Sequence, residues 1–149
     1  MSFNKQGIEV KCMEIILLAL ANKTNERLVA NLLKNNYNIQ AYTAGPEITQ
    51  RYVLIITDGK TLTALKRKYP GFKKDLSGIF QPVLLISSKK GVNLITARIW
   101  QAIDELVTTP ISGMELFASV EILMRARRQS IMLLEKNAGA GLLLVDSAS

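Results

Sequence analysis

The chain has 149 residues, 48% of them apolar, and carries a net charge of +7 from 19 Lys and Arg against 12 Asp and Glu. Its single cysteine, Cys12, excludes an intrachain disulfide and multi-cysteine zinc sites, and the absence of histidine excludes Ser-His-Asp triads, Cys-His pairs, histidine metal ligands and phosphohistidine. No apolar run approaches the roughly 20 residues of a membrane span, so we expect a cytoplasmic protein without membrane insertion.

The first half of the chain alternates apolar runs with segments of helical period. Residues 14–21 (EIILLALA) have the length and composition of a strand covered on both faces, and 22–36 change to a helical pattern. Residues 38–44 indicate a second strand, 45–51 a short helix or turn, and 52–57 (YVLIIT) a third, fully buried strand. The pattern is that of a strand-helix-strand repeat.

The alternation continues in the second half. The expected elements are a helix at 60–69, a loop at 71–81, a buried strand at 82–87, a helix at 91–104, a short strand at 105–109 and a long last helix at 112–136. Five strands alternating with helices predict an α/β fold with a parallel sheet covered on both faces.

The organisation expected along the chain is a flexible leader at 1–12, one domain at 13–135 and a tail at 136–149. The end of the chain (NAGAGLLLVDSAS) fits no pattern. A disordered end, part of a following segment and sequence added to the natural chain all remain open for it.

The carboxyl ends of the strands are where ligands collect in such sheets. Asp58 follows the strand 52–57 and is the only acidic residue that ends an expected strand. The "DGKT" that begins at Asp58 is not a phosphate-binding P-loop, because the position that requires glycine is Leu54, inside the strand. No G-x-G-x-x-G motif is present to support a dinucleotide site.

Three segments together resemble the receiver domain of two-component response regulators, of the divergent pseudo-receiver type. They are YVLIITDG at 52–59, PVLLISS at 82–88 and IDELVTTPISGMELFASVEILMRARRQS at 103–130. The resemblance covers roughly 13–130. It implies a flavodoxin-like three-layer α/β/α sandwich, in which a five-stranded parallel sheet has the order 2-1-3-4-5.

The resemblance also implies roles for individual residues. Asp58 matches the aspartate that accepts a phosphoryl group, and Ser87 and Leu106 match the hydroxyl and aromatic switch positions. Pro110 matches a proline that follows a cis peptide bond, here Thr109–Pro110. The pocket around Asp58 would be formed by Asn22, Lys23, Lys60, Ser88, Thr109 and Pro110.

Several family positions are changed, which puts the chemistry of the site in doubt. Leu20 and Ala21 occupy the places of the acidic pair that holds magnesium, and Thr109 replaces the lysine that contacts the phosphoryl group. A lone carboxylate binds Mg²⁺ poorly, and phosphoryl transfer depends on cationic stabilisation. We therefore expect weak or lost magnesium binding, no metal site or other cofactor, no enzymatic activity, and weak or absent phosphorylation at Asp58.

A hypothesis for the missing positive charge is that Lys23 or Lys60 pairs with Asp58. The plain alternative is that both lysines are solvated. Trp100 is interpreted as an anchor in the core or at an interface, and the alternative is a stacking platform. Apolar positions of the last helix could prolong a seam into a dimer or a downstream helix; these are Leu116, Val120, Leu123, Ile131 and Leu134.

The function predicted is an atypical receiver domain that acts by protein contact through the face of its fourth helix, fifth strand and fifth helix. The expected partner is a sensor kinase or another signalling protein, and a homodimer is left open. The alternative is a nucleic-acid-binding or flavodoxin-like ligand-binding module that uses the basic stretch 60–74. Nucleic acid is disfavoured as a partner, because only Tyr69 and Phe72 interleave with the basic residues there.

Overall fold

The structure is a computed structural model that describes residues 14–43, 52–69 and 79–148, with side chains described up to residue 137. Its strands are β1 (Ile15–Ala19), β2 (Asn38–Ala41), β3 (Leu54–Thr57), β4 (Val83–Ser87) and β5 (Glu105–Thr108). Its helices are α1 (Lys23–Leu33), α2 (Gly59–Lys68), α3 (Lys89–Val92), α4 (Ala97–Ala102) and α5 (Gly113–Ala148).

The five strands form one parallel sheet of order β2-β1-β3-β4-β5, which confirms the predicted topology. The strands β1, β3 and β4 are apolar throughout their central positions because helices cover both of their faces. Thr57 is the buried polar exception in β3, and its hydroxyl donates to the Ala19 carbonyl oxygen at 2.8 Å. This bond ties the carboxyl ends of β1 and β3 together.

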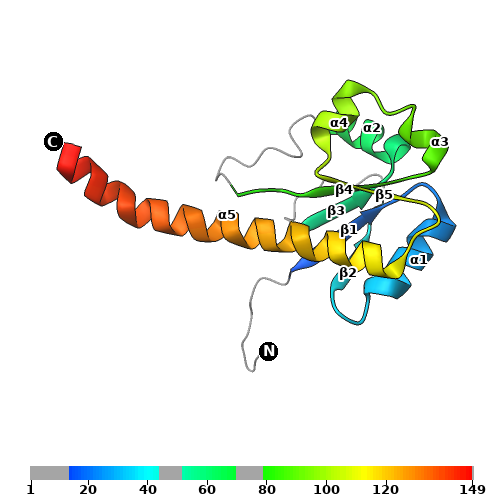
Figure 1. Cartoon of the computed structure of the whole chain (residues 1–149), viewed down its shortest axis with the longest axis horizontal. Helices are drawn as coiled ribbons and strands as arrows, with labels where there is room; N and C mark the ends of the chain where they lie inside the picture. The colour runs from blue at the N-terminus through cyan, green and yellow to red at the C-terminus, as the bar shows by residue number, and fades with distance from the viewer. Residues whose placement is uncertain (1–13, 44–51, 70–78, 149) are drawn as a thin grey trace.

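The helices form two layers, α1 and α5 on one face of the sheet and α2, α3 and α4 on the other (Figure 1). The first face holds the larger part of the core. There Val29 and Leu33 of α1 and Leu116 and Val120 of α5 pack on the inward-facing residues of β1, β3, β4 and β5. On the second face the core is smaller and its helical contributions are Leu62, Ile99 and Ala102.

The expected helix at 91–104 is wrong in its extent, because the structure divides it into α3 and α4. Ser88 caps α3, where its Oγ accepts from the Gly91 N–H at 2.9 Å, and Thr96 caps α4, where its Oγ1 accepts from the Ile99 N–H at 3.4 Å. The first cap starts the helix before residue 91, and the second, at Thr96, starts a new helix inside the expected one and so interrupts it. The segment 93–96 between α3 and α4 contains the exposed Leu94.

The last helix is longer than expected, because α5 continues through the segment 136–148 and extends beyond the sheet as a single rod (Figure 1). Leu116, Val120 and Leu123, three positions of the expected seam, are buried in the domain's own core. They are therefore not exposed for contact with another chain. Ile131 and Leu134 are half-buried further along the helix.

Within the described residues, no helix combines the length and the apolar character required to span a membrane.

Candidate functional site

Asp58 lies at the carboxyl edge of the sheet, where β3 ends and α2 begins. It is the N-cap of α2, and its Oδ1 accepts a hydrogen bond from the Thr61 N–H at 2.9 Å. Its Oδ2 accepts a second bond from the Ala21 N–H, in the loop after β1, at 2.7 Å. Both carboxylate oxygens therefore bind backbone donors, and Asp58 connects the β1 loop to the first turn of α2.

The residues around Asp58 do not fit a magnesium ion. Leu20 is apolar and buried in the core, and Ala21 presents its backbone N–H, not an oxygen ligand, to the carboxylate. In the parts of the chain that the structure describes, no group of three or more Cys, Asp or Glu side chains could hold a metal. Since Mg²⁺ requires oxygen ligands in a near-octahedral arrangement, Asp58 would have to supply the only carboxylate.

The structure does not place either lysine in an ion pair with Asp58. Lys23 instead pairs with Glu26 one turn along α1, with Nζ and Oε1 3.3 Å apart. Lys60 is exposed in the first turn of α2, and among the described residues it has no ion-pair partner. The hypothesis of a permanent Asp58–lysine pair is thus not supported by this geometry.

The other expected pocket residues gather at the same edge of the sheet. The Ser87 hydroxyl donates to the Ser88 carbonyl oxygen at 3.1 Å. Thr109 donates its N–H to the Ser87 carbonyl oxygen at 2.9 Å, and the peptide bond Thr109–Pro110 is cis, as predicted. Asn22 caps α1, where its side chain accepts from the Asn25 N–H at 3.0 Å.

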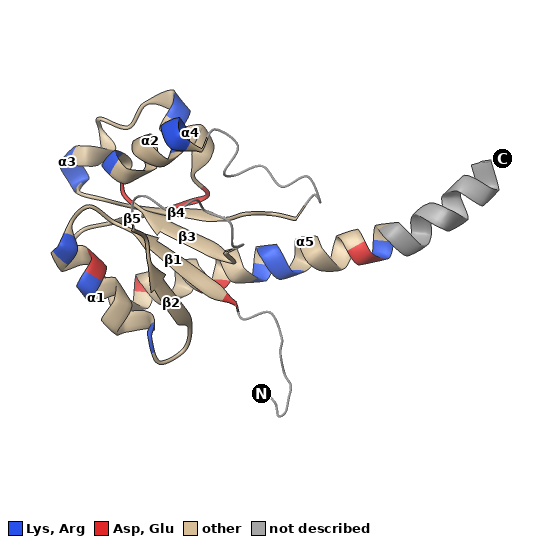
Figure 2. Ribbon diagram, turned by 180° about the vertical axis from the view of Figure 1, so that it is seen from behind, with Lys and Arg blue, Asp and Glu red and all other residues tan. Residues whose placement is uncertain are grey.

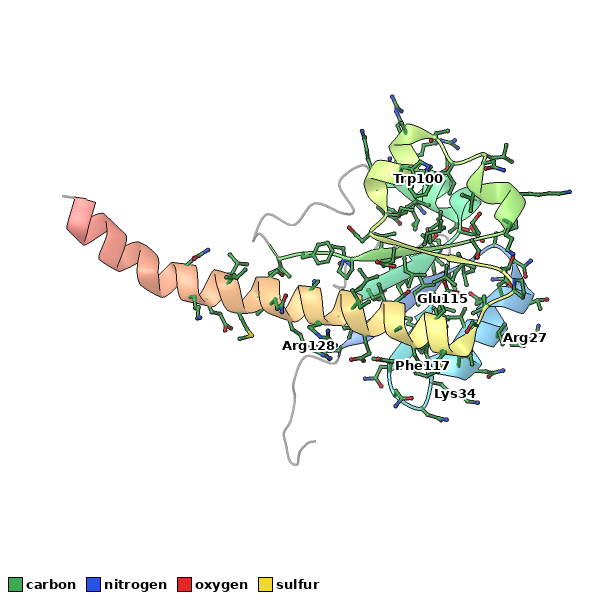
Figure 3. All side chains as sticks on the ribbon, viewed as in Figure 1. Arg27, Lys34, Trp100, Glu115, Phe117 and Arg128 are labelled. Atoms are coloured by element: carbon green, nitrogen blue, oxygen red, sulfur yellow. The ribbon has the colours of Figure 1, made fainter. Side chains whose placement is uncertain are left out.

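Leu106 and Pro110 do not line the large cleft that opens at this edge between α2 and the α3–α4 segment. Leu106 is half-buried against the smaller of the two core clusters, and Pro110 is exposed. Trp100, which projects from α4, is 47% exposed and so is not a core residue (Figure 3). An interface anchor and a stacking platform are the interpretations of Trp100 that remain.

A large cleft, here named the basic cleft, opens at this edge between α2 and the α3–α4 segment, with a volume of about 1000 Å³. Its charged residues are Asp58, Lys60, Lys66, Arg67 and Arg98. Its remaining lining consists of Ala21, Asn22, Asn25, Gly59, Thr63, Leu85, Ile86, Ser87, Ser88, Gly91, Leu94, Ile95, Thr96, Ile99 and Thr109.

Reasoning from the sequence identified Asp58, Asn22, Lys60, Ser87, Ser88 and Thr109 in this cleft but missed Arg98 and the segment 94–96. A signal was present in the sequence, because α2, α3 and α4 contain no acidic residue while each carries Lys or Arg. Figure 2 shows these basic residues in blue on all three helices. Lys73 and Lys74 of the basic stretch lie outside the described residues.

In sequence, no protein-family model matches this chain, and no curated protein matches it significantly. In structure, the chain is similar to the receiver domain of a response regulator from Bacteroides fragilis, with a TM-score of 0.56 and 16% identity over 76% of this chain and 98% of that one. It is also similar to a receiver-modulated diguanylate cyclase from Pelobacter carbinolicus, with a TM-score of 0.59 and 21% identity over 78% of this chain and 97% of that one.

A third similar structure is NtrX from Brucella abortus in complex with ADP, with a TM-score of 0.68 and 16% identity. That match covers 87% of this chain but only 30% of the other. At these identities the likeness establishes the fold alone, and it agrees with the sheet order and helix layers described above. The chain has the flavodoxin-like fold of response regulator receiver domains.

Proposed function

We propose that this chain is an atypical receiver domain of a two-component signalling pathway that acts by protein contact, without efficient phosphorylation at Asp58 and without catalysis of its own. The observation that carries the proposal is the pair of hydrogen bonds from the Ala21 and Thr61 N–H groups to the Asp58 carboxylate. Asp58 has the position of a phosphoacceptor but the hydrogen bonds of a structural cap.

The energetics of phosphoryl transfer support this proposal. Transfer to a carboxylate brings two anionic groups together, and proteins promote it by positioning and by cationic stabilisation. Here the acidic pair and the lysine of the resembled family are replaced by Leu20, Ala21 and Thr109. An adduct on either Asp58 oxygen would also disturb a bond that holds the β1 loop or the first turn of α2, at a cost of about 1 kcal/mol for the cap.

Exposed apolar side chains support the contact part of the proposal. Trp100 on α4 and Met114 on α5, which is 83% exposed, belong to the two helices that flank β5, the edge strand of the sheet. Aromatic and methionine side chains are enriched at protein interfaces. The expected partner is a sensor kinase or another signalling protein that covers this face.

The test is incubation of the full chain with acetyl phosphate and magnesium, read by intact mass and by amide chemical shifts around Asp58. We expect no adduct under conditions that modify a conventional receiver domain completely. Asp58→Asn is the control, because any modification it abolishes must be on this carboxylate. Rapid formation of an adduct that disappears in Asp58→Asn would contradict the proposal.

Trp100 is the only tryptophan in the chain, so its fluorescence reports contact at α4 directly. Titration with purified sensor kinases is expected to shift its emission to shorter wavelength when a partner covers the ring. Trp100→Ala should weaken that binding about tenfold or more, since buried tryptophans dominate interface energies. Binding that leaves the emission unchanged and tolerates Trp100→Ala would place the contact elsewhere.

A further inference from the structure

The basic cleft reaches down to the sheet between two helical segments. Its lining includes Leu85 and Ile86 at the carboxyl end of β4, whose side chains are buried in the core, Ile86 on the α1–α5 side of the sheet. The interruption between α3 and α4 places residues 94–96 along the other side, where the exposed Leu94 and the half-buried Ile95 supply accessible apolar surface. The cleft is thus a concavity with one apolar side, and its volume of about 1000 Å³ is at the upper end of the range for small-molecule sites.

The charges of the cleft are almost all positive. Lys60, Lys66, Arg67 and Arg98 line it, against the single acid Asp58. Both oxygens of Asp58 already accept backbone hydrogen bonds. In the described part of the chain none of the four cations has an ion-pair partner. The cleft therefore concentrates unneutralised positive charge, which attracts anions.

The secondary structure explains how this charge is gathered. On α2, Leu62 and Leu65 are buried against the sheet side, whereas Lys60, Thr63 and Arg67, spaced three and four residues apart, share another face and line the cleft. Arg98 reaches the cleft from α4, and the Lys66 Nζ donates to the Arg98 carbonyl oxygen at 3.1 Å. Lys66 thereby links α2 to α4 and leaves the exposed Arg67 and Arg98 guanidinium groups on the rim.

We propose that the basic cleft binds a small organic phosphate noncovalently, with its phosphate groups held by Arg67, Arg98 and Lys60 and its apolar or planar body placed against Leu94 and Ile95. Guanidinium groups bind phosphate through paired hydrogen bonds, and the apolar side of the cleft provides a surface that inorganic phosphate would leave uncovered. The concave shape of the cleft favours a compact ligand over a nucleic-acid duplex, which would contact only its rim.

This proposal does not depend on the chemistry of Asp58. Phosphorylation assays test whether Asp58 forms a covalent adduct, whereas the cleft is tested by reversible binding to groups on α2 and α4. Either proposal can therefore fail while the other stands.

The test uses the full chain and three probes, ADP, pyrophosphate and adenosine, with affinities measured by calorimetry and by amide chemical shifts. ADP is expected to bind more tightly than either of the other two, because only ADP combines phosphates with a planar body. Arg67→Gln combined with Arg98→Gln should weaken ADP binding about a hundredfold, taking about tenfold for each charged hydrogen-bonding group removed. Both side chains are exposed, and the Arg98 carbonyl that binds Lys66 is retained in the variant.

The matched control is Lys89→Gln combined with Lys90→Gln on α3. It removes the same net charge from exposed residues of the same layer that do not line the cleft. Its effect on ADP affinity should stay below about threefold, because neither lysine lines the cleft and exposed charges are screened at physiological salt. Equal losses in the two double variants would overturn the proposal, since binding would then follow net charge. Absence of binding by all three probes would also overturn the proposal. The same holds for an oligonucleotide that binds more tightly than ADP and whose affinity Arg67→Gln combined with Arg98→Gln leaves unchanged.

Discussion

The two helical layers of this domain differ in packing and in charge. The α1–α5 layer buries Val29, Leu33, Leu116 and Val120 against the sheet, and its acids and bases are mixed. The α2–α3–α4 layer contributes fewer buried side chains, contains only basic charged residues, and is hollowed by the basic cleft. The difference indicates that one layer carries most of the stability of the domain and the other is available for recognition.

The packing difference predicts unequal costs of truncation, which is the largest effect expected. Leu116→Ala in α5, where the side chain is 0% exposed, should destabilise the domain by about 2–5 kcal/mol. Ile99→Ala in α4, where the side chain is 8% exposed beside the cleft, should cost about 2 kcal/mol. Urea unfolding followed by circular dichroism measures both, and a cost for Ile99→Ala equal to that for Leu116→Ala would remove the distinction between the layers.

Two neighbouring arginines of α5 allow a buried contact and an exposed contact within the α1–α5 layer to be compared. Arg127 is 8% exposed and its Nη1 donates to the Phe80 carbonyl oxygen at 2.8 Å. Arg127→Met should cost about 1.5–3 kcal/mol, the range for hydrogen bonds that involve a charged group.

Arg128 is the matched control for that measurement. Arg128 lies on α5 (Figure 3) and forms an exposed ion pair with Glu14 at 3.5 Å. Arg128→Met should therefore lower the free energy of unfolding by less than about 1 kcal/mol. Thermal unfolding of both variants gives the comparison. A larger loss for Arg128→Met would mean that the surface pair, and not the buried donor, fixes this part of α5.

Two glycines of the α2–α3–α4 layer test how closely the cleft rim is packed. A Cβ on Gly91 would lie 2.5 Å from the Ser87 Oγ and 3.0 Å from the Ser88 Oγ, whereas a Cβ on Gly59 would meet nothing within 4 Å. Gly91→Ala should displace the Ser87 hydroxyl and shift α3. The free energy of unfolding should nevertheless stay within about 1 kcal/mol of wild type, because alanine favours the helix. Gly59→Ala should raise the free energy of unfolding of the domain by about 0.5–1 kcal/mol.

Amide chemical shifts distinguish these two glycine variants. Changes in Gly91→Ala should concentrate at residues 87–92 and 109, and those in Gly59→Ala should remain near the start of α2. Unchanged shifts around Ser87 in Gly91→Ala would contradict the close approach of residue 91 to the Ser87 hydroxyl.

The smallest effect concerns Tyr37 in the α1–α5 layer. Burial, followed by the hydrogen bond from its hydroxyl to the Glu121 carboxylate and the negative charge of that carboxylate, together raise the pKa of Tyr37 to about 12. Because the folded state prefers the neutral phenol, this contribution to stability is complete below pH 10 and is lost as pH rises toward 12.

Stability measured from pH 9 to pH 12 in wild type and in Tyr37→Phe gives the contribution of Tyr37 as the difference between the two curves. The wild-type curve should fall more steeply than that of Tyr37→Phe. Parallel curves would mean that the phenol titrates equally in folded and unfolded chains.

The strands β1, β3 and β4 could be predicted because they are apolar on both faces and their length is set by local composition. The position of Asp58 at a strand end follows from the same pattern. The break between α3 and α4 was harder to predict, since the cap at Thr96 competes with an apolar periodicity that supports one helix. Arg98 was missed because nothing local indicates which side of α4 faces α2.

The sequence by itself therefore determined the layered architecture, the parallel strands and the acid-free stretch of helices, because each of these depends on residue type and short-range spacing. The strand order and the missing acidic pair followed from the resemblance to receiver domains. Only the tertiary structure decided that the Ala21 N–H, 37 positions before Asp58, binds its carboxylate, and that α2 and α4 enclose a basic cleft. The physical reason is that a hydrogen bond or a cavity between distant segments depends on how the sheet and helices pack together, which local patterns do not specify.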